Sequence, residues 1–154
     1  MKRYKLLTII FIGIIFLTGC SKTKKAITGD EFYDICDDMD IGISEITSKF
    51  DYAESVYQTA EEGYRVTFIE GKTLNDISGL FNDELKNLYS ERIADEDVDN
   101  LDKKAINGKN FKSFELNYKD NYYYLIYVDK TFLYVQSNQD NKDKVRQIID
   151  TMKY

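Results

Sequence analysis

Residues 109–136 read KNFKSFELNYKDNYYYLIYVDKTFLYVQ, and this stretch decides the fold. In its first part Phe114, Leu116 and Tyr118 alternate with polar residues. Such alternation is the period of a half-buried β-strand. Short polar segments at 119–121 and 129–130 divide the stretch and are typical of turns. The sequence therefore predicts an antiparallel meander with strands at 109–118, 122–128 and 131–136.

Further strands are predicted upstream of this meander. Asn107-Gly108 is the strongest two-residue hairpin signal, and it would join a short strand at 103–106 to the meander. Two more strand-like runs, at about 51–59 and 64–70, flank a turn at 61–63. In the second run Tyr64, Val66 and Phe68 alternate with polar residues, which again predicts one buried side.

Three segments have the periodicity of amphipathic helices. Thr28 and Glu31 fit a capping box at the start of the first, which ends near residues 40–42. Thr73 can cap the second, and the third covers about 140–153. Residues 90–102 are the least organised stretch. The predicted apolar stripes are Phe32, Ile35, Cys36 and Met39 in the first helix, Ile77, Leu80, Phe81, Leu85 and Leu88 in the second, and Val145, Ile148, Ile149 and Met152 in the third.

This order of elements, α-ββ-α-ββββ-α, predicts the α+β class. The simplest assembly is one twisted antiparallel sheet of about five to six strands with helices packed on one face. The other face, rich in tyrosine, would be partly exposed to water. We expect this single domain to cover residues 29–154.

The tyrosines of the meander are the weak candidates for a ligand-binding surface. One side of the sheet should be core, and the other could present Tyr123, Tyr127 and Tyr134 to a glycan or a protein. The alternative is cross-strand aromatic pairing on a solvated face.

The N-terminus has the layout of an export signal. Residues 1–20 read MKRYKLLTIIFIGIIFLTGC, with three basic residues before an apolar run from Leu6 to Leu17. Twelve residues at a helical rise cover about 18 Å, well short of a hydrocarbon core of about 30 Å. The sequence therefore predicts a signal segment at 1–19 in preference to a spanning helix.

Leu17-Thr18-Gly19-Cys20 resembles the lipobox of bacterial lipoproteins. The resemblance covers the first twenty residues and implies lipid on the Cys20 sulfur, cleavage before Cys20, and a place on the outer face of the cell membrane. The general pattern and composition resemble small surface lipoproteins of low-GC Gram-positive bacteria. The polar stretch to residue 28 would be a tether, whose lysines lie against anionic head groups or are simply solvated.

Charge is divided unevenly along the chain. Residues 30–102 hold 5 basic and 21 acidic residues, a net charge of −16, whereas residues 103–154 hold 10 and 6, a net charge of +4. A surface this acidic disfavours nucleic acid, whose affinity for proteins comes mainly from phosphate neutralisation. It suits solubility first, and a divalent cation or a basic partner second.

Catalytic signatures are missing from the sequence. The chain has no histidine, which removes the common nucleophilic triads and the usual zinc ligand. Cys36 falls on an apolar helical stripe among aspartates, which oppose thiolate formation, so we expect a buried core thiol. We therefore expect neither an enzyme nor a cofactor.

An acidic segment gives a weak calcium candidate. Asp95, Asp97 and Asp99 fit the first ligand positions of a calcium loop, with Asp102 nearby. Asn100 stands where the loop needs glycine and Ile106 where it needs glutamate, so an EF-hand is excluded. A looser site is the remaining alternative to a solvated loop.

Three functions remain open on the sequence alone. The first is a non-catalytic binding or interaction module at the cell envelope, with an envelope protein or glycan as partner. The second is an accessory or structural subunit of a membrane complex. The third is a hydrolase of cell-wall or glycan material that works by carboxylates alone.

Overall fold

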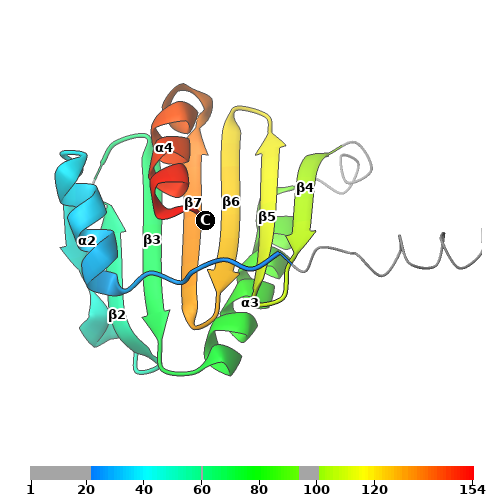
Figure 1. Ribbon diagram of the computed structural model, residues 1–154. Coiled ribbons are helices and arrows are strands. Elements are labelled where there is room, and N and C mark those ends of the chain that lie inside the picture. The colour runs from blue at the N-terminus through cyan, green and yellow to red at the C-terminus, as the bar shows by residue number, and fades with distance from the viewer. Residues whose placement is uncertain (1–21, 60, 94–100) are drawn as a thin grey trace, which may run out of the picture.

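The computed structural model describes residues 22–59, 61–93 and 101–154. It shows an α+β fold in which one antiparallel sheet carries helices on both faces (Figure 1). The helices are α2 (Gly29–Asp38), α3 (Leu74–Arg92) and α4 (Lys142–Met152), with short 3-10 turns η1 (Thr47–Lys49) and η3 (Gln139–Asn141). The strands are β1 (Ile43–Glu45), β2 (Ala53–Thr59), β3 (Tyr64–Gly71), β4 (Asp102–Asn107), β5 (Phe111–Tyr118), β6 (Asn121–Val128) and β7 (Thr131–Asn138).

The sheet joins two meanders side by side. Its strand order is β1-β2-β3-β7-β6-β5-β4, and every neighbouring pair is antiparallel. Strands β3 and β7, distant in sequence, pair over seven positions from Tyr64 opposite Ser137 to Glu70 opposite Thr131. The described residues thus form seven strands, more than the predicted five to six. The additional strand is β1, whose three residues are too few for a periodic signal.

The prediction that all helices pack on one face of the sheet was wrong. Helices α2 and α4 pack on one face of the sheet, and α3 packs on the other. Strand β6 is consequently buried on both sides: Tyr122, Tyr123 and Tyr124 are 1%, 3% and 9% exposed. The tyrosine-rich face predicted to be partly wet is the face that α3 covers. A central strand with two covered faces reads as a continuous apolar run, and this explains the unbroken tyrosines.

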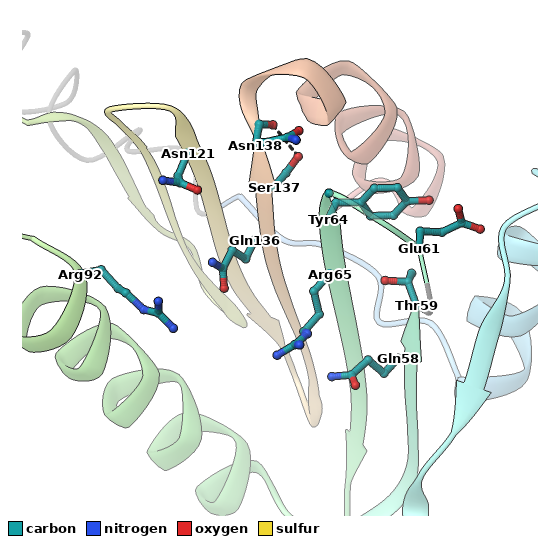
Figure 2. Close-up of a pocket in the computed structure, with 11 residues that line it drawn as sticks. Gln58, Thr59, Glu61, Tyr64, Arg65, Arg92, Asn121, Gln136, Ser137 and Asn138 are labelled. Carbon is teal, nitrogen blue, oxygen red and sulfur yellow. Dashed lines mark hydrogen bonds between the residues drawn. The ribbon is translucent and has the colours of Figure 1, made fainter.

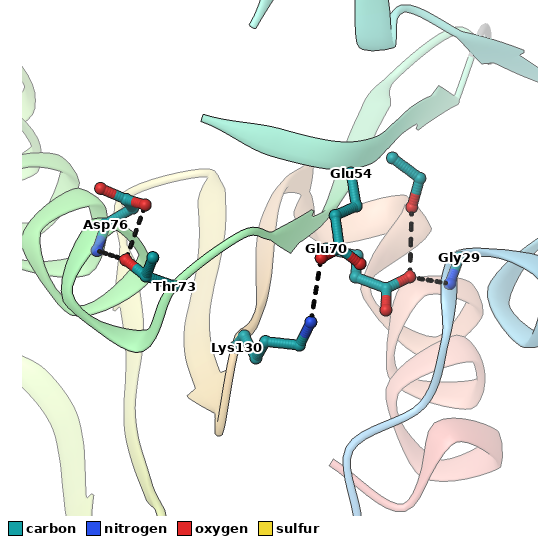
Figure 3. Close-up of polar contacts among 7 residues, drawn as sticks. Gly29, Glu54, Glu70, Thr73, Asp76 and Lys130 are labelled. Atoms are coloured by element: carbon teal, nitrogen blue, oxygen red, sulfur yellow. Dashed lines mark hydrogen bonds and ion pairs between the residues drawn. The ribbon is translucent and has the colours of Figure 1, made fainter. Parts of the chain in front are cut away.

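The predicted helix starts are confirmed. Glu31 N–H donates to Thr28 Oγ1 (3.2 Å) while Thr28 N–H donates to Glu31 Oε2 (2.8 Å), which completes the capping box of α2. Thr73 Oγ1 caps α3 by accepting from Asp76 N–H at 3.2 Å (Figure 3). Because both caps leave backbone donors satisfied, each helix begins at a defined residue.

Polar contacts tie the start of α2 to the sheet (Figure 3). Gly29 N–H donates to the Glu70 carboxylate at 3.0 Å, and the Ser55 hydroxyl donates to the same oxygen at 3.5 Å. Nearby, Lys130 and Glu54 form an ion pair at 3.1 Å across the sheet end. The carboxylate of Glu70 thus lies at the positive end of the helix dipole.

The β4–β5 turn differs from the predicted two-residue hairpin. Asn107 still pairs with Lys112, and Gly108 does not have the positive φ that such a hairpin requires. The turn is instead held by the N-terminal segment: Lys109 N–H donates to Lys22 O at 3.0 Å, and the Asn110 side chain both accepts from Lys24 N–H (3.1 Å) and donates to Lys24 O (2.8 Å).

Residues 22–28, expected to form part of a tether, are therefore bound to the domain. Ile27 is buried, and its N–H donates to the Tyr154 hydroxyl at 3.1 Å. The Thr131 hydroxyl donates to Val128 O, so the Tyr154 hydroxyl donates to Thr131 Oγ1 at 2.5 Å. Figure 1 shows this segment crossing the sheet from the β4–β5 end toward α2. Over the described residues, none of the helices combines the length and the apolarity needed to cross a bilayer.

Candidate ligand-binding site

A polar cavity of about 610 Å³ opens where α3 diverges from the end of the sheet (Figure 2). Its wall draws on strands β2, β3, β6 and β7 and on the last turn of α3. The residues with charged or amide groups that line it are Gln58, Glu61, Arg65, Arg92, Asn121, Gln136 and Asn138. The Glu61 carboxylate accepts a hydrogen bond from Gly42 N–H at 3.2 Å. We refer to this cavity as the arginine pocket.

Strand register explains why polar groups gather there. Arg65 lies opposite Gln136, and Gln136 lies opposite Tyr123, so these three residues form one row across β3, β7 and β6 on the α3 face. Farther along the same face the side chains are apolar and pack beneath α3, with Phe132 and Leu125 fully buried. The apolar part holds α3 in place, and the polar row is left at the open end.

The two arginines give the pocket its charge. Arg65 comes from β3 and Arg92 from α3, and Figure 2 shows both reaching into the space between these elements. Neither side chain forms an ion pair or a hydrogen bond with any residue of the described ranges 22–59, 61–93 and 101–154. Guanidinium groups bind carboxylates and phosphates through paired N–H donors. The arrangement therefore offers two unsatisfied cationic forks beside neutral amides.

A smaller cavity of about 130 Å³ continues from the arginine pocket along α3. It shares Arg65, Arg92 and Gln136 with the larger one and adds Glu84 and Tyr134. Burial raises the pKa of the Glu84 carboxyl, and the neighbouring carboxylates of Glu91 and Asp83 add to this effect. Burial also raises the pKa of Tyr134 to about 12, although both arginines oppose that shift. The two guanidinium charges thus act on the same small region.

Another cavity, of about 210 Å³, lies on the opposite face beside α4. Its arginine, Arg146, is already bound to Glu115 at 2.7 Å. Lys24, which also lines it, donates from its ammonium group to Lys153 O at 3.1 Å. Two of the three cations that line this cavity, Arg146 and Lys24, thus have partners, and the third is Lys104. This cavity is therefore a weaker candidate for an anion than the arginine pocket.

The structure separates the tyrosines that the sequence grouped. Tyr123 is buried beneath α3, and Tyr127 packs edge-on against Phe81 with ring centroids 5.5 Å apart. Tyr134 lines the smaller cavity. These three side chains therefore do not form an exposed aromatic platform.

The other predicted site residues lie partly outside the structure. Cys20, Asp95, Asp97 and Asp99 fall outside the described residues. Asp102 is exposed at the start of β4, where its carboxylate accepts from the Asn117 amide at 2.8 Å. Among the residues that the structure covers, no three side chains of histidine, cysteine, aspartate or glutamate are placed to share a metal ion.

Cys36 is buried in α2, against the face of the sheet that α4 also covers. Burial raises the pKa of its thiol to about 11. Because the thiolate is the reactive form, we expect iodoacetamide to alkylate folded protein about 100-fold more slowly than an ordinary thiol at neutral pH. The measurement compares the alkylation rate in buffer with the rate in urea. Equal rates would contradict the buried position.

Comparison with known proteins yields little. No family model and no curated protein matches the chain. Among solved structures, the chain is similar to the crystal structure of a GTP binding regulator from Thermotoga maritima, with a TM-score of 0.47 and 13% identity over 83% of this chain and 89% of that one. Similarity this weak assigns neither a family nor an activity.

Proposed function

We propose that this chain is a lipid-anchored protein of the outer face of the cell membrane that binds a small anionic ligand without transforming it. The observation that carries the binding proposal is the pair Arg65 and Arg92 in the arginine pocket, which lack partners among the described residues. The anchor is inferred from the lipobox-like segment that ends at Cys20 and from the basic and apolar residues before it.

The chemistry of the pocket favours a carboxylate or a phosphate group. Each guanidinium carries five N–H donors, and the two come from separate elements, so they can approach one anion from two sides. The amides of Asn121 and Gln136 add donors and acceptors at the same rim. A charge-assisted hydrogen bond contributes about 1.5–3 kcal/mol, which makes the arginines the main source of affinity.

A binding role fits the residues better than catalysis. The chain contains no histidine. The Cys36 thiol is buried and does not line the arginine pocket. The arginine pocket is lined by two cations, several amides and the Glu61 carboxylate, which accepts from Gly42 N–H. Cations and amides bind and orient anions but do not take up a proton near neutral pH. We therefore assign the pocket a recognition role.

Exchange of both arginines tests the pocket. In the Arg65→Gln/Arg92→Gln variant we expect affinity for inorganic phosphate and for citrate to fall at least tenfold, because two charge-assisted contacts are lost. Titration calorimetry and ligand-dependent melting temperature measure this change. The control is Lys49→Gln/Lys86→Gln, which removes the same charge from exposed sites outside the cavity. Equal losses in both variants, or no loss in either, would refute the pocket.

A separate experiment tests the anchor. Growth of the host with radiolabelled palmitate should label the protein, and the mature form should partition into detergent. Cys20→Ala should abolish both the label and the processing before residue 20. Detection of unlabelled protein in the cytosol would overturn the envelope assignment while leaving the phosphate titration interpretable.

A further inference from the structure

Two lysines at the turn of the β4–β5 hairpin, Lys109 and Lys112, lie beside the point where the N-terminal segment reaches the domain. Lys103 and Lys104 of the same hairpin lie opposite Leu116 and Glu115, toward the other end of β5. Lys22, the first described residue, is joined to this turn through the 3.0 Å hydrogen bond from Lys109 N–H. We call the surface formed by Lys22, Lys109 and Lys112 the basic corner.

Every lysine of the basic corner is exposed. Within the described part of the chain, none of the three forms an ion pair. The corner contrasts with residues 30–102, which carry a net charge of −16. The basic corner is thus a positive patch on a protein whose net charge is negative.

We propose that the basic corner docks onto the anionic head groups of the membrane that holds the lipid on Cys20. The inference rests on the proposed anchor and adds the orientation of the domain. Cys20 precedes Lys22 by two residues, which span at most about 7 Å, so the corner cannot lie far from the bilayer surface. Juxtamembrane lysines are attracted to anionic lipid, by about fivefold in the equilibrium for each residue.

The orientation places the arginine pocket away from the membrane. Strand β5 runs from Phe111, beside the basic corner, to Tyr118 at the other end of the sheet, over about 25 Å. Asn121 and Asn138, which line the pocket, lie at that far end. Docking by the corner therefore presents the pocket to the surrounding medium.

Lysines beside an edge strand also prevent pairing with other chains, which is the competing explanation. The two explanations differ in their dependence on lipid charge. Edge protection requires no lipid, whereas docking requires anionic head groups. The two explanations can therefore be separated by measuring how close the domain lies to the bilayer in vesicles of defined lipid charge.

The experiment uses the mature lipidated protein in vesicles of phosphatidylglycerol or of phosphatidylcholine alone. A fluorophore is attached to Asn107→Cys beside the corner or to Asp120→Cys at the opposite end, both exposed positions. The buried Cys36 should not be labelled. We expect doxyl-lipid quenching at position 107 and not at 120, in phosphatidylglycerol only, and weaker quenching at high salt.

Charge removal completes the test. Lys109→Gln/Lys112→Gln should lower the ratio of docked to undocked protein roughly 25-fold, whereas Lys49→Gln/Lys86→Gln should leave it unchanged. Equal quenching at positions 107 and 120, or quenching independent of lipid charge, would overturn the docking alone. Protein that fails to partition into detergent would refute the lipid anchor, and the docking with it.

Discussion

Replacement of Phe32 by alanine is expected to lower the free energy of unfolding by about 3–5 kcal/mol. Phe32 is fully buried in α2, and its ring stacks on Phe68 of β3 with centroids 4.8 Å apart. Helix α2 has ten residues, too few to be stable without such packing. Because small domains are stable by only about 5–15 kcal/mol, this single change should remove a large part of the total. Urea denaturation measures this loss of stability. We expect the dependence of the free energy of unfolding on urea concentration to keep the same slope.

The adjacent residue supplies the control. Tyr33 lies in the same helix but is 47% exposed, with its ring 6.1 Å from that of Tyr57. Tyr33→Ala should therefore cost less than about 1 kcal/mol. An equal loss of unfolding free energy in the two alanine variants would contradict the described packing of α2 on the sheet.

Alkaline pH is expected to unfold the protein through its buried tyrosines. Burial raises the pKa of Tyr122 and of Tyr134 to about 12, against an ordinary value of 10.0. Between these two values the unfolded chain loses phenolic protons that the folded chain retains. The free energy of unfolding should therefore be unaffected below pH 10 and fall as the pH rises toward 12, by roughly 2–3 kcal/mol for each tyrosine at full ionisation.

Circular dichroism and tyrosinate absorbance, followed together, measure this transition. Solvent-exposed tyrosines ionise in the folded chain, so the first part of the absorbance change should precede any change in circular dichroism. We expect the remaining part, from the buried phenols, to coincide with the loss of circular dichroism, because ionisation of these phenols requires unfolding. The variants Tyr122→Phe and Tyr134→Phe should move the transition to higher pH, since each removes one of the responsible groups. Full tyrosine ionisation with native circular dichroism would contradict the burial of these hydroxyl groups.

Local patterns predicted most of the elements. The capping boxes and stripes located α2, α3 and α4, and the alternation of Tyr64, Val66 and Phe68 located β3, because these signals depend on neighbouring residues. Local patterns could not predict that helices cover both faces of the sheet. The apolar stripe of α3 shows that the helix packs on something, but only the complete sheet shows which face it covers.

The arginine pocket depends on the same long-range information. The alternation in β3 already placed Arg65 on the side opposite to Tyr64 and Val66. That Arg92 approaches it follows from the packing of α3, and that Gln136 lies beside it follows from the β3–β7 pairing. Those contacts join residues far apart in the chain. The scarcity of arginine, with only positions 65, 92 and 146 beyond residue 20, was the one available clue.

The pairing of β3 with β7 has a consequence for the order of folding. Strand β7 is the last in chain order, yet it lies at the centre of the sheet between β3 and β6. Until β7 has been synthesised, the first meander has an open edge at β3. Helix α2 then also lacks its packing against α4, which follows β7 in the chain. Such long-range closure delays assembly. A polypeptide with this topology therefore completes its sheet only after the final strand has been synthesised.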